Sequence, residues 1–142
     1  MSRLINSETA GKERTRLTKV IVISIRELLH QQEASDLTRD LIACVLMSLD
    51  GIYDTVDFSV EAWEKRGYWI KADHFRMDWQ WTKIVADQMR PLVEAENYNE
   101  LIPLMVQVLQ SLENVKVSEN HRLGTPWKGA WEALQYKNQV KG

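Results

Sequence analysis

The spacing of apolar residues along the chain predicts helices, and the signal is clearest between residues 36 and 66. Apolar side chains there recur every three or four positions, as expected for one face of a helix. They are Leu37, Leu41, Val45, Leu49, Ile52, Val56, Val60 and Trp63. Ser35 precedes the stretch as a favourable N-cap, and Gly67 follows it as a favourable stop. We expect a helix from about residue 36 to residue 66, with Gly51 able to soften it.

A first helix is predicted over residues 9–31, although it contains the run "VIVISI" at 20–25. β-branched residues favour strands, so this run could also form a strand. A strand needs a pairing partner, and the chain has no second run of this kind. The pattern therefore favours a helix that is buried on most sides.

Three more helices complete the predicted fold. One covers residues 69–94 and is expected to bend or end at Pro91. Another covers 99–115, capped by Asn97 or Asn99. A short one begins at Pro126 after a Thr125 cap, and its stripe contains Trp127, Trp131 and Leu134. Short connections make sequential helices antiparallel. We predict an all-α, up-down four-helix bundle with a short fifth C-terminal helix, in one domain (1–142) with 1–8 and 138–142 frayed.

Residues 68–81, "YWIKADHFRMDWQW", hold three of the six tryptophans of the chain. On a helix, Ile70, His74, Met77, Trp81, Ile84, Val85, Gln88 and Leu92 share one face. Tyr68, Ala72, Phe75, Trp79 and Ala86 share another face, offset by roughly 120°. A helix that is apolar on two sides needs two covering surfaces. The cover for the second side is either the helix with Trp127 and Trp131 or another molecule.

This two-sided pattern favours a structural role for the aromatic residues, because large rings bury about 150–250 Å² each without any chemistry. We predict a non-catalytic interaction or regulatory protein that forms a homodimer or binds an unidentified protein partner. The predicted interface residues are Tyr68, Phe75, Trp79, Trp127 and Trp131.

An alternative is a small-molecule or metal-binding bundle, which could be an enzyme, built around His74. We expect His74 on the inner face of its helix, with Asp78 one turn later as a hydrogen-bond acceptor. Trp81 and Gln88 would line the same pocket. The chain lacks H-E-x-x-H and the paired E-x-x-H helices of di-iron bundles. We therefore predict no metal, no cofactor and no catalytic residue.

Two charged segments are candidate binding surfaces. The carboxylates of Asp50, Asp54, Asp57 and Glu61, continued by Glu64, line up on the face of their helix opposite its apolar stripe. We expect a solvated face there, or a docking surface for a basic partner. Residues 12–19, "KERTRLTK", suggest a third alternative, weak nucleic-acid binding.

Composition limits these choices. The net charge is −2, which argues against a dedicated nucleic-acid binder. The single cysteine, Cys44, lies in an apolar run and is expected to be an inert buried thiol. No stretch approaches the roughly 20 apolar residues of a membrane span, and residues 1–16 do not resemble a secretory signal. A cytoplasmic location is the resulting expectation.

Overall fold

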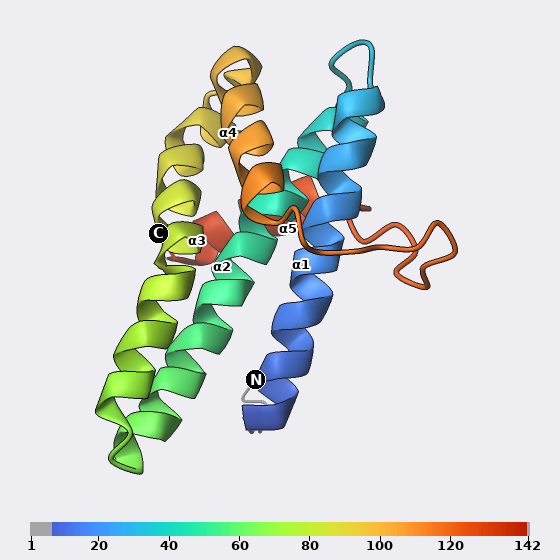
Figure 1. The fold of residues 1–142 in the computed structure, drawn as a ribbon. Helices are drawn as coiled ribbons and strands as arrows, with labels where there is room; N and C mark the ends of the chain where they lie inside the picture. Colours follow the sequence, from blue (N-terminus) through green and yellow to red (C-terminus); the bar gives the residue numbers. More distant parts are fainter. Residues whose placement is uncertain (1–6, 142) are drawn as a thin grey trace.

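The computed structural model describes residues 7–141, and this part of the chain folds into helices connected by turns and loops. The helices are α1 (Ser7–His30), α2 (Asp36–Lys65), α3 (Trp69–Glu94), α4 (Tyr98–Ser111) and α5 (Ala130–Lys141). The first four run alternately up and down, and α5 lies behind α2 (Figure 1). The predicted all-α bundle with a short C-terminal helix is confirmed.

Helix α2 is the centre of the molecule, because α1, α3 and α5 all pack against it. Its residues 41–46 are buried without a break, so that half of the helix is enclosed on all sides. The later half is buried along one face only, through Ile52, Val56 and Val60. The amphipathic pattern seen in the sequence therefore describes the second half of α2 better than the first.

The helix ends follow the local sequence signals. At the start of α2, the Ser35 N–H donates to Thr38 Oγ1 at 3.0 Å. At the start of α4, Asn97 Oδ1 accepts a hydrogen bond from the Glu100 N–H at 3.3 Å. Gly67 ends α2 with a φ of 83°, a left-handed conformation that costs glycine little. The predicted caps at Ser35 and Asn97 and the stop at Gly67 are confirmed.

The run "VIVISI" is helical, and all six of its residues are buried. Helix α2 packs against this part of α1, and the chain after α4 crosses α1 on another side (Figure 1). Val117 and Trp127 of that crossing segment line a hollow together with Ile23. Helix α2 and the crossing segment cover different sides of the run 20–25, which explains why this part of α1 is stable without a polar face.

Several predicted boundaries were wrong. Helix α4 ends at Ser111 rather than at 115. The predicted range 69–94 of α3 is confirmed, and Pro91 lies inside the helix without ending it. Helix α5 begins at Ala130 instead of Pro126, because residues 126–129 form a turn in which Gly129 has a φ of 76°. Residues 7–8 and 138–141, expected to fray, belong to α1 and α5. Residues 1–6 and 142 lie outside the described part.

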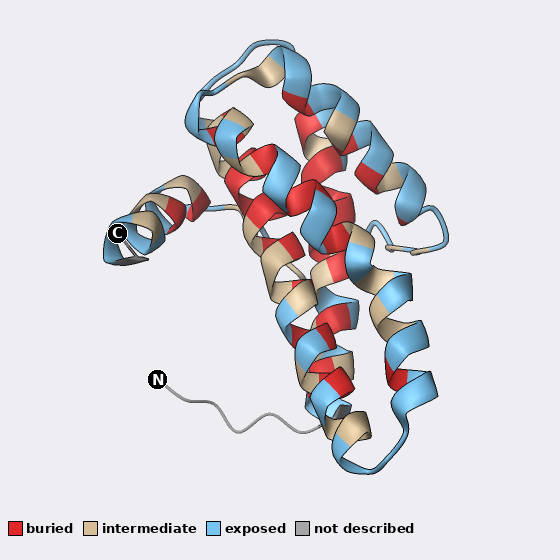
Figure 2. Ribbon diagram, turned by 90° about the vertical axis from the view of Figure 1, so that its left-hand side faces the viewer, coloured by how far each residue is buried: buried red, intermediate tan, exposed pale blue. Residues whose placement is uncertain are grey.

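Helix α4 has 14 residues, against 24, 30 and 26 for the first three helices. It starts beside the end of α3 and runs back along only part of it (Figure 1). Buried residues are correspondingly frequent in the half of the bundle that contains α4 and sparser at the other end (Figure 2). In α3, residues 82–93 include five buried side chains, whereas residues 69–81 include only Ala72. The end of the bundle away from α4 is therefore built from three helices, α1, α2 and α3.

Helix α5 is held on α2 by a hydrogen bond, a cation–π contact and the burial of an apolar side chain. The Trp131 N–H, at the open start of α5, donates to Asp40 Oδ1 at 2.9 Å. The Arg39 guanidinium lies 5.1 Å from the centre of the Trp131 ring, and Leu134 is buried. A carboxylate at a helix N-terminus is favourable, so Asp40 fixes where α5 begins on α2.

Two glycines, one with a left-handed backbone conformation and one inside a helix, test the backbone conformations of the structure. Gly67→Ala should lower the free energy of unfolding by about 1 kcal/mol, because alanine is strained at positive φ. Gly11→Ala should raise it by roughly 0.5–1 kcal/mol, because Gly11 is inside α1 and an added Cβ meets no atom within 4 Å. Urea unfolding followed by circular dichroism measures both. Equal effects of the two substitutions would contradict the assignment of Gly67 to a left-handed cap.

Candidate interaction surface

The inner face of α3 is the one that contains Phe75 and Trp79. Small side chains lie along it: Ala72, Thr82 and Ala86 are fully buried. Phe75 is half-buried, with its ring edge-on to Trp63 of α2 at 4.9 Å between centroids. This face packs against the rest of the same chain, so Phe75 and Trp79 stabilise the fold.

The outer face of α3 carries a mainly apolar stripe, with two polar members, that has the spacing of a coiled-coil seam. Successive members are separated by four, three, four, three and four residues, which keeps them on one side of a helix. They are Ile70, His74, Met77, Trp81, Ile84 and Gln88. Ile70 is 76% exposed, Met77 71% and Ile84 51%, whereas Trp81 is half-buried. We call these six residues the α3 stripe.

The sequence interpretation was wrong about which side of α3 faces the bundle over residues 70–84, although Val85 of the same predicted face is buried. It placed His74 on the inner face, but His74 is exposed and the Phe75–Trp79 side faces the bundle. His74 and Asp78 do line one shallow hollow, together with Trp63, Ile70, Lys71 and Phe75. Gln88 lies 14 residues beyond His74, about 21 Å along the helix. The four residues proposed for an enclosed ligand or metal pocket therefore lie along an open face.

The five predicted interface residues do not form one surface. Trp131 lies beside Arg39 near the start of α2, whereas Phe75 lies beside Trp63 near its end. Twenty-four residues of helix separate those two positions, about 36 Å. Trp127 is in the turn before α5, and Tyr68 is exposed at the start of α3. Helix α5 packs against α2 and not against α3, so it leaves the second face of α3 uncovered.

Arg14 is the unexpected residue of the inner region. It is only 9% exposed, although the sequence places it in a polar, basic segment. Its guanidinium carbon lies 4.7 Å from the centre of the Phe75 ring and 5.9 Å from that of Trp79. Its Nη2 donates to Ser59 Oγ at 3.4 Å, a long hydrogen bond. Its Nη1 is buried and has no hydrogen-bond partner among residues 7–141.

The surroundings of Arg14 do not fully compensate its charge. Burial lowers the pKa of the Arg14 guanidinium, and no ion pair with a carboxylate of residues 7–141 accompanies that shift. An unpaired buried ion costs several kcal/mol. Cation–π attraction to the two rings offsets about 2 kcal/mol of this desolvation cost when the pair is shielded from water. Arg14 is therefore a buried cation with unused hydrogen-bonding capacity.

The acidic row on α2 is exposed only in its middle. Asp50 accepts two hydrogen bonds from Arg90 of α3, at 2.9 and 3.0 Å, and Glu64 pairs with Arg76 at 3.3 Å. Asp54, Asp57 and Glu61, which lie between these two pairs, are exposed. The predicted solvated face is confirmed for the three middle residues and wrong for the two ends, which hold α3 against α2.

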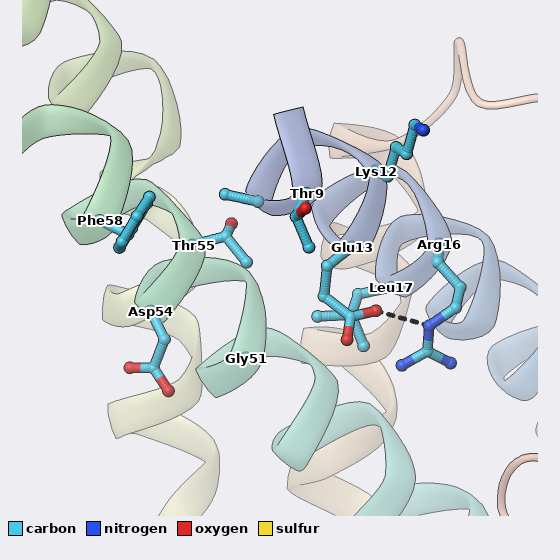
Figure 3. Close-up of a pocket in the computed structure, with 10 residues that line it drawn as sticks. Thr9, Lys12, Glu13, Arg16, Leu17, Gly51, Asp54, Thr55 and Phe58 are labelled. Atoms are coloured by element: carbon cyan, nitrogen blue, oxygen red, sulfur yellow. Dashed lines mark hydrogen bonds and ion pairs between the residues drawn. The ribbon is translucent and has the colours of Figure 1, made fainter. Parts of the chain in front are cut away.

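The basic segment 12–19 is divided among different environments. Lys12 pairs with Glu8, and Arg16 pairs with Glu13, whereas Arg14 is buried. Figure 3 shows Arg16 meeting Glu13 and Lys12 pointing away beside a pocket of about 640 Å³ between α1 and α2. Two of the cations are thus neutralised by acids on the same helix, which weakens the case for a nucleic-acid surface.

One pattern that sequence reasoning passed over is a single E-x-x-H pair, Glu27 and His30, at the end of α1. These side chains line a hollow with Glu119 and His121 from the segment after α4. His121 Nδ1 accepts a hydrogen bond from the Leu123 N–H at 3.2 Å. Within residues 7–141, no group of three or more histidine, cysteine, aspartate or glutamate side chains is arranged to hold a metal ion.

Cys44 is buried, as predicted, and Ser24 donates a hydrogen bond to its sulfur at 3.6 Å. Burial raises the pKa of the Cys44 thiol, which disfavours the reactive thiolate.

No helix in the described range is long and apolar enough to cross a membrane. Comparison of the chain with protein-family models, with curated protein sequences and with solved structures found no significant match.

The two faces of α3 can be distinguished by a pair of alanine substitutions. Phe75→Ala should lower the free energy of unfolding by about 2 kcal/mol, less than for a fully buried ring because Phe75 is half-buried. Met77→Ala, two residues away on the exposed face, should change it by less than about 0.5 kcal/mol. Chemical denaturation of both variants measures the difference. A larger loss for Met77→Ala would show that the faces are assigned wrongly.

Two aspartates should show opposite pH dependence. Partial desolvation, and then neighbouring Glu61, raise the pKa of Asp57 although the residue is exposed, so its ionised form disfavours the folded state. Asp57→Asn should therefore unfold at higher denaturant than the parent at pH 7, and this gain should disappear as the pH falls through the raised pKa. Hydrogen bonds from Lys83 and Arg90 lower the pKa of Asp87. Asp87→Asn should be less stable at pH 7, and its deficit should disappear in acid. Parallel pH-dependent unfolding curves for both variants would contradict these assignments.

Proposed function

We propose that this protein is a non-catalytic interaction protein that acts as a homodimer, with the α3 stripe as its contact surface. The observation that supports the proposal is the exposure of Ile70, Met77 and Ile84 at seven-residue intervals on one helix face. Exposed apolar residues that form a continuous row are typical of interaction sites. An unpartnered helix with this spacing is suited to packing against another helix.

A second copy of the chain is a partner of matching shape. We consider two α3 helices that pack antiparallel, with the two-fold axis of the dimer passing near residue 79. Each residue of one helix then faces the residue of the other helix whose number brings the sum of the two to about 158. Met77 then packs against Trp81 of the partner subunit, and Ile70 lies beside the partner's Gln88. Sulfur–aromatic contacts are favourable, so the centre of such an interface would be its strongest part.

The expected affinity follows from the size of the stripe. Its span of 19 residues, 70–88, extends about 27 Å, and a helix is about 10 Å wide. Such a strip covers on the order of 270 Å² per copy, about a third of the roughly 800 Å² per partner of a standard interface. We therefore expect a reversible dimer with a micromolar dissociation constant.

Sedimentation equilibrium over roughly 1–500 µM tests the dimer in a range that brackets that constant. The double variant Met77→Lys/Ile84→Lys should raise the dissociation constant at least about tenfold, because it places two charges in a desolvated contact. Tyr136→Lys is the matched control, since Tyr136 is 70% exposed but lies on α5.

A protein that remains monomeric at all these concentrations would overturn the homodimer. So would a dimer that the stripe variant and the control weaken equally. Both variants should keep the unfolding free energy of the parent within about 0.5 kcal/mol, because the replaced side chains are exposed.

A further inference from the structure

A small basic pocket lies where α1, α3 and the chain after α4 meet. It has a volume of about 310 Å³. Helix α1 contributes Arg14, Thr15, Thr18 and Lys19, helix α3 contributes Trp79, and the segment after α4 contributes Val115 and Lys116. Figure 1 shows that segment leaving the end of α4 and crossing α1. The lining therefore includes three cations, and no carboxylate from the described part of the chain belongs to it.

The charge balance of this pocket differs from that of the surrounding surface. Elsewhere on α1, Lys12 pairs with Glu8 and Arg16 with Glu13. Arg14 is nine-tenths buried, and its Nη1 has no partner. The net charge of the whole chain is −2, so a hollow lined by three cations and by no carboxylate of the described residues is a local feature rather than a general one.

We propose that this pocket binds a small phosphate monoester, with its phosphate held by Arg14, Lys19 and Lys116. A guanidinium offers paired N–H groups that match phosphate oxygens, and two ammonium groups match the remaining charge of a dianion. The ring of Trp79 and the side chain of Val115 provide an apolar wall for the organic part. A volume near 310 Å³ is at the lower limit of small-molecule sites, which fits one monoester.

A single phosphate fits this pocket better than a nucleic-acid strand does. A strand needs a row of available cations along the surface. Here the neighbouring cations Lys12 and Arg16 are paired with acids of the same helix. The pocket is also separate from the α3 stripe, because Trp79 is on the inner side of α3. A negative result for the α3 stripe therefore does not bear on the phosphate pocket, and the reverse also holds.

Isothermal titration calorimetry with phenyl phosphate, inorganic phosphate and benzoate at constant ionic strength tests the proposal. Phenyl phosphate should bind saturably, and more tightly than either of the other two, because only it combines the phosphate with a ring. Lys116→Gln should weaken its binding about tenfold, as expected for loss of a charge-assisted hydrogen bond. Lys12→Gln, an exposed lysine outside the pocket, should leave binding unchanged.

Arg14→Met should abolish binding and leave a folded protein at least as stable as the parent, because it removes a buried cation whose Nη1 lacks a partner. If that variant does not fold, the double variant Lys19→Gln/Lys116→Gln takes its place and should likewise remove binding.

Three results would overturn the proposal. One is the absence of saturable phenyl phosphate binding up to roughly 10 mM. Another is equal weakening by Lys116→Gln and Lys12→Gln, which would indicate a nonspecific charge effect. The third is tighter binding of a single-stranded oligonucleotide with affinity that grows with its length, which would assign the site to nucleic acid.

Discussion

Helix α4 is too short to extend along the full length of α2. Fourteen residues of helix extend about 21 Å, whereas the 30 residues of α2 extend about 45 Å. A fourth helix this short can complete the core at one end only. At that end the core is aliphatic and continuous, as in the buried run 41–46. At the other end three helices enclose a core that contains Arg14 and Ser59 and leaves one side of α3 uncovered.

Local patterns were enough to predict the helices, because periodicity, caps and glycine stops act within a few residues of the chain. Ser35, Asn97 and Gly67 fixed helix ends as expected. The orientation of α3 could not be predicted in the same way. A helical wheel gives the angles between its residues but not the direction of its neighbours, and α3 is apolar on two sides. The informative signal was the position of the small residues, because Ala72 and Ala86 on the inner face allow α3 to approach its neighbours closely and the outer stripe has no residue of that size.

The candidate sites depended still more on contacts between distant residues. Arg14 belongs to a polar segment, and nothing near it in the sequence indicates burial. Its environment comes from Ser59, 45 residues later, and from Phe75 and Trp79. The ends of the acidic row were missed for the same reason, since Asp50 and Glu64 are neutralised by arginines of α3 rather than of α2. Charge counts along one helix cannot anticipate such pairs.

The opposed faces of α3 allow the stability and the proposed interactions of this protein to be separated. Residues on the inner side, such as Phe75, contribute to the core, whereas Met77 and Ile84 contact little of their own chain. Substitutions at distant sites without shared partners are close to additive in free energy. A change on the outer face can therefore alter association while the three-helix end and its buried cation stay intact.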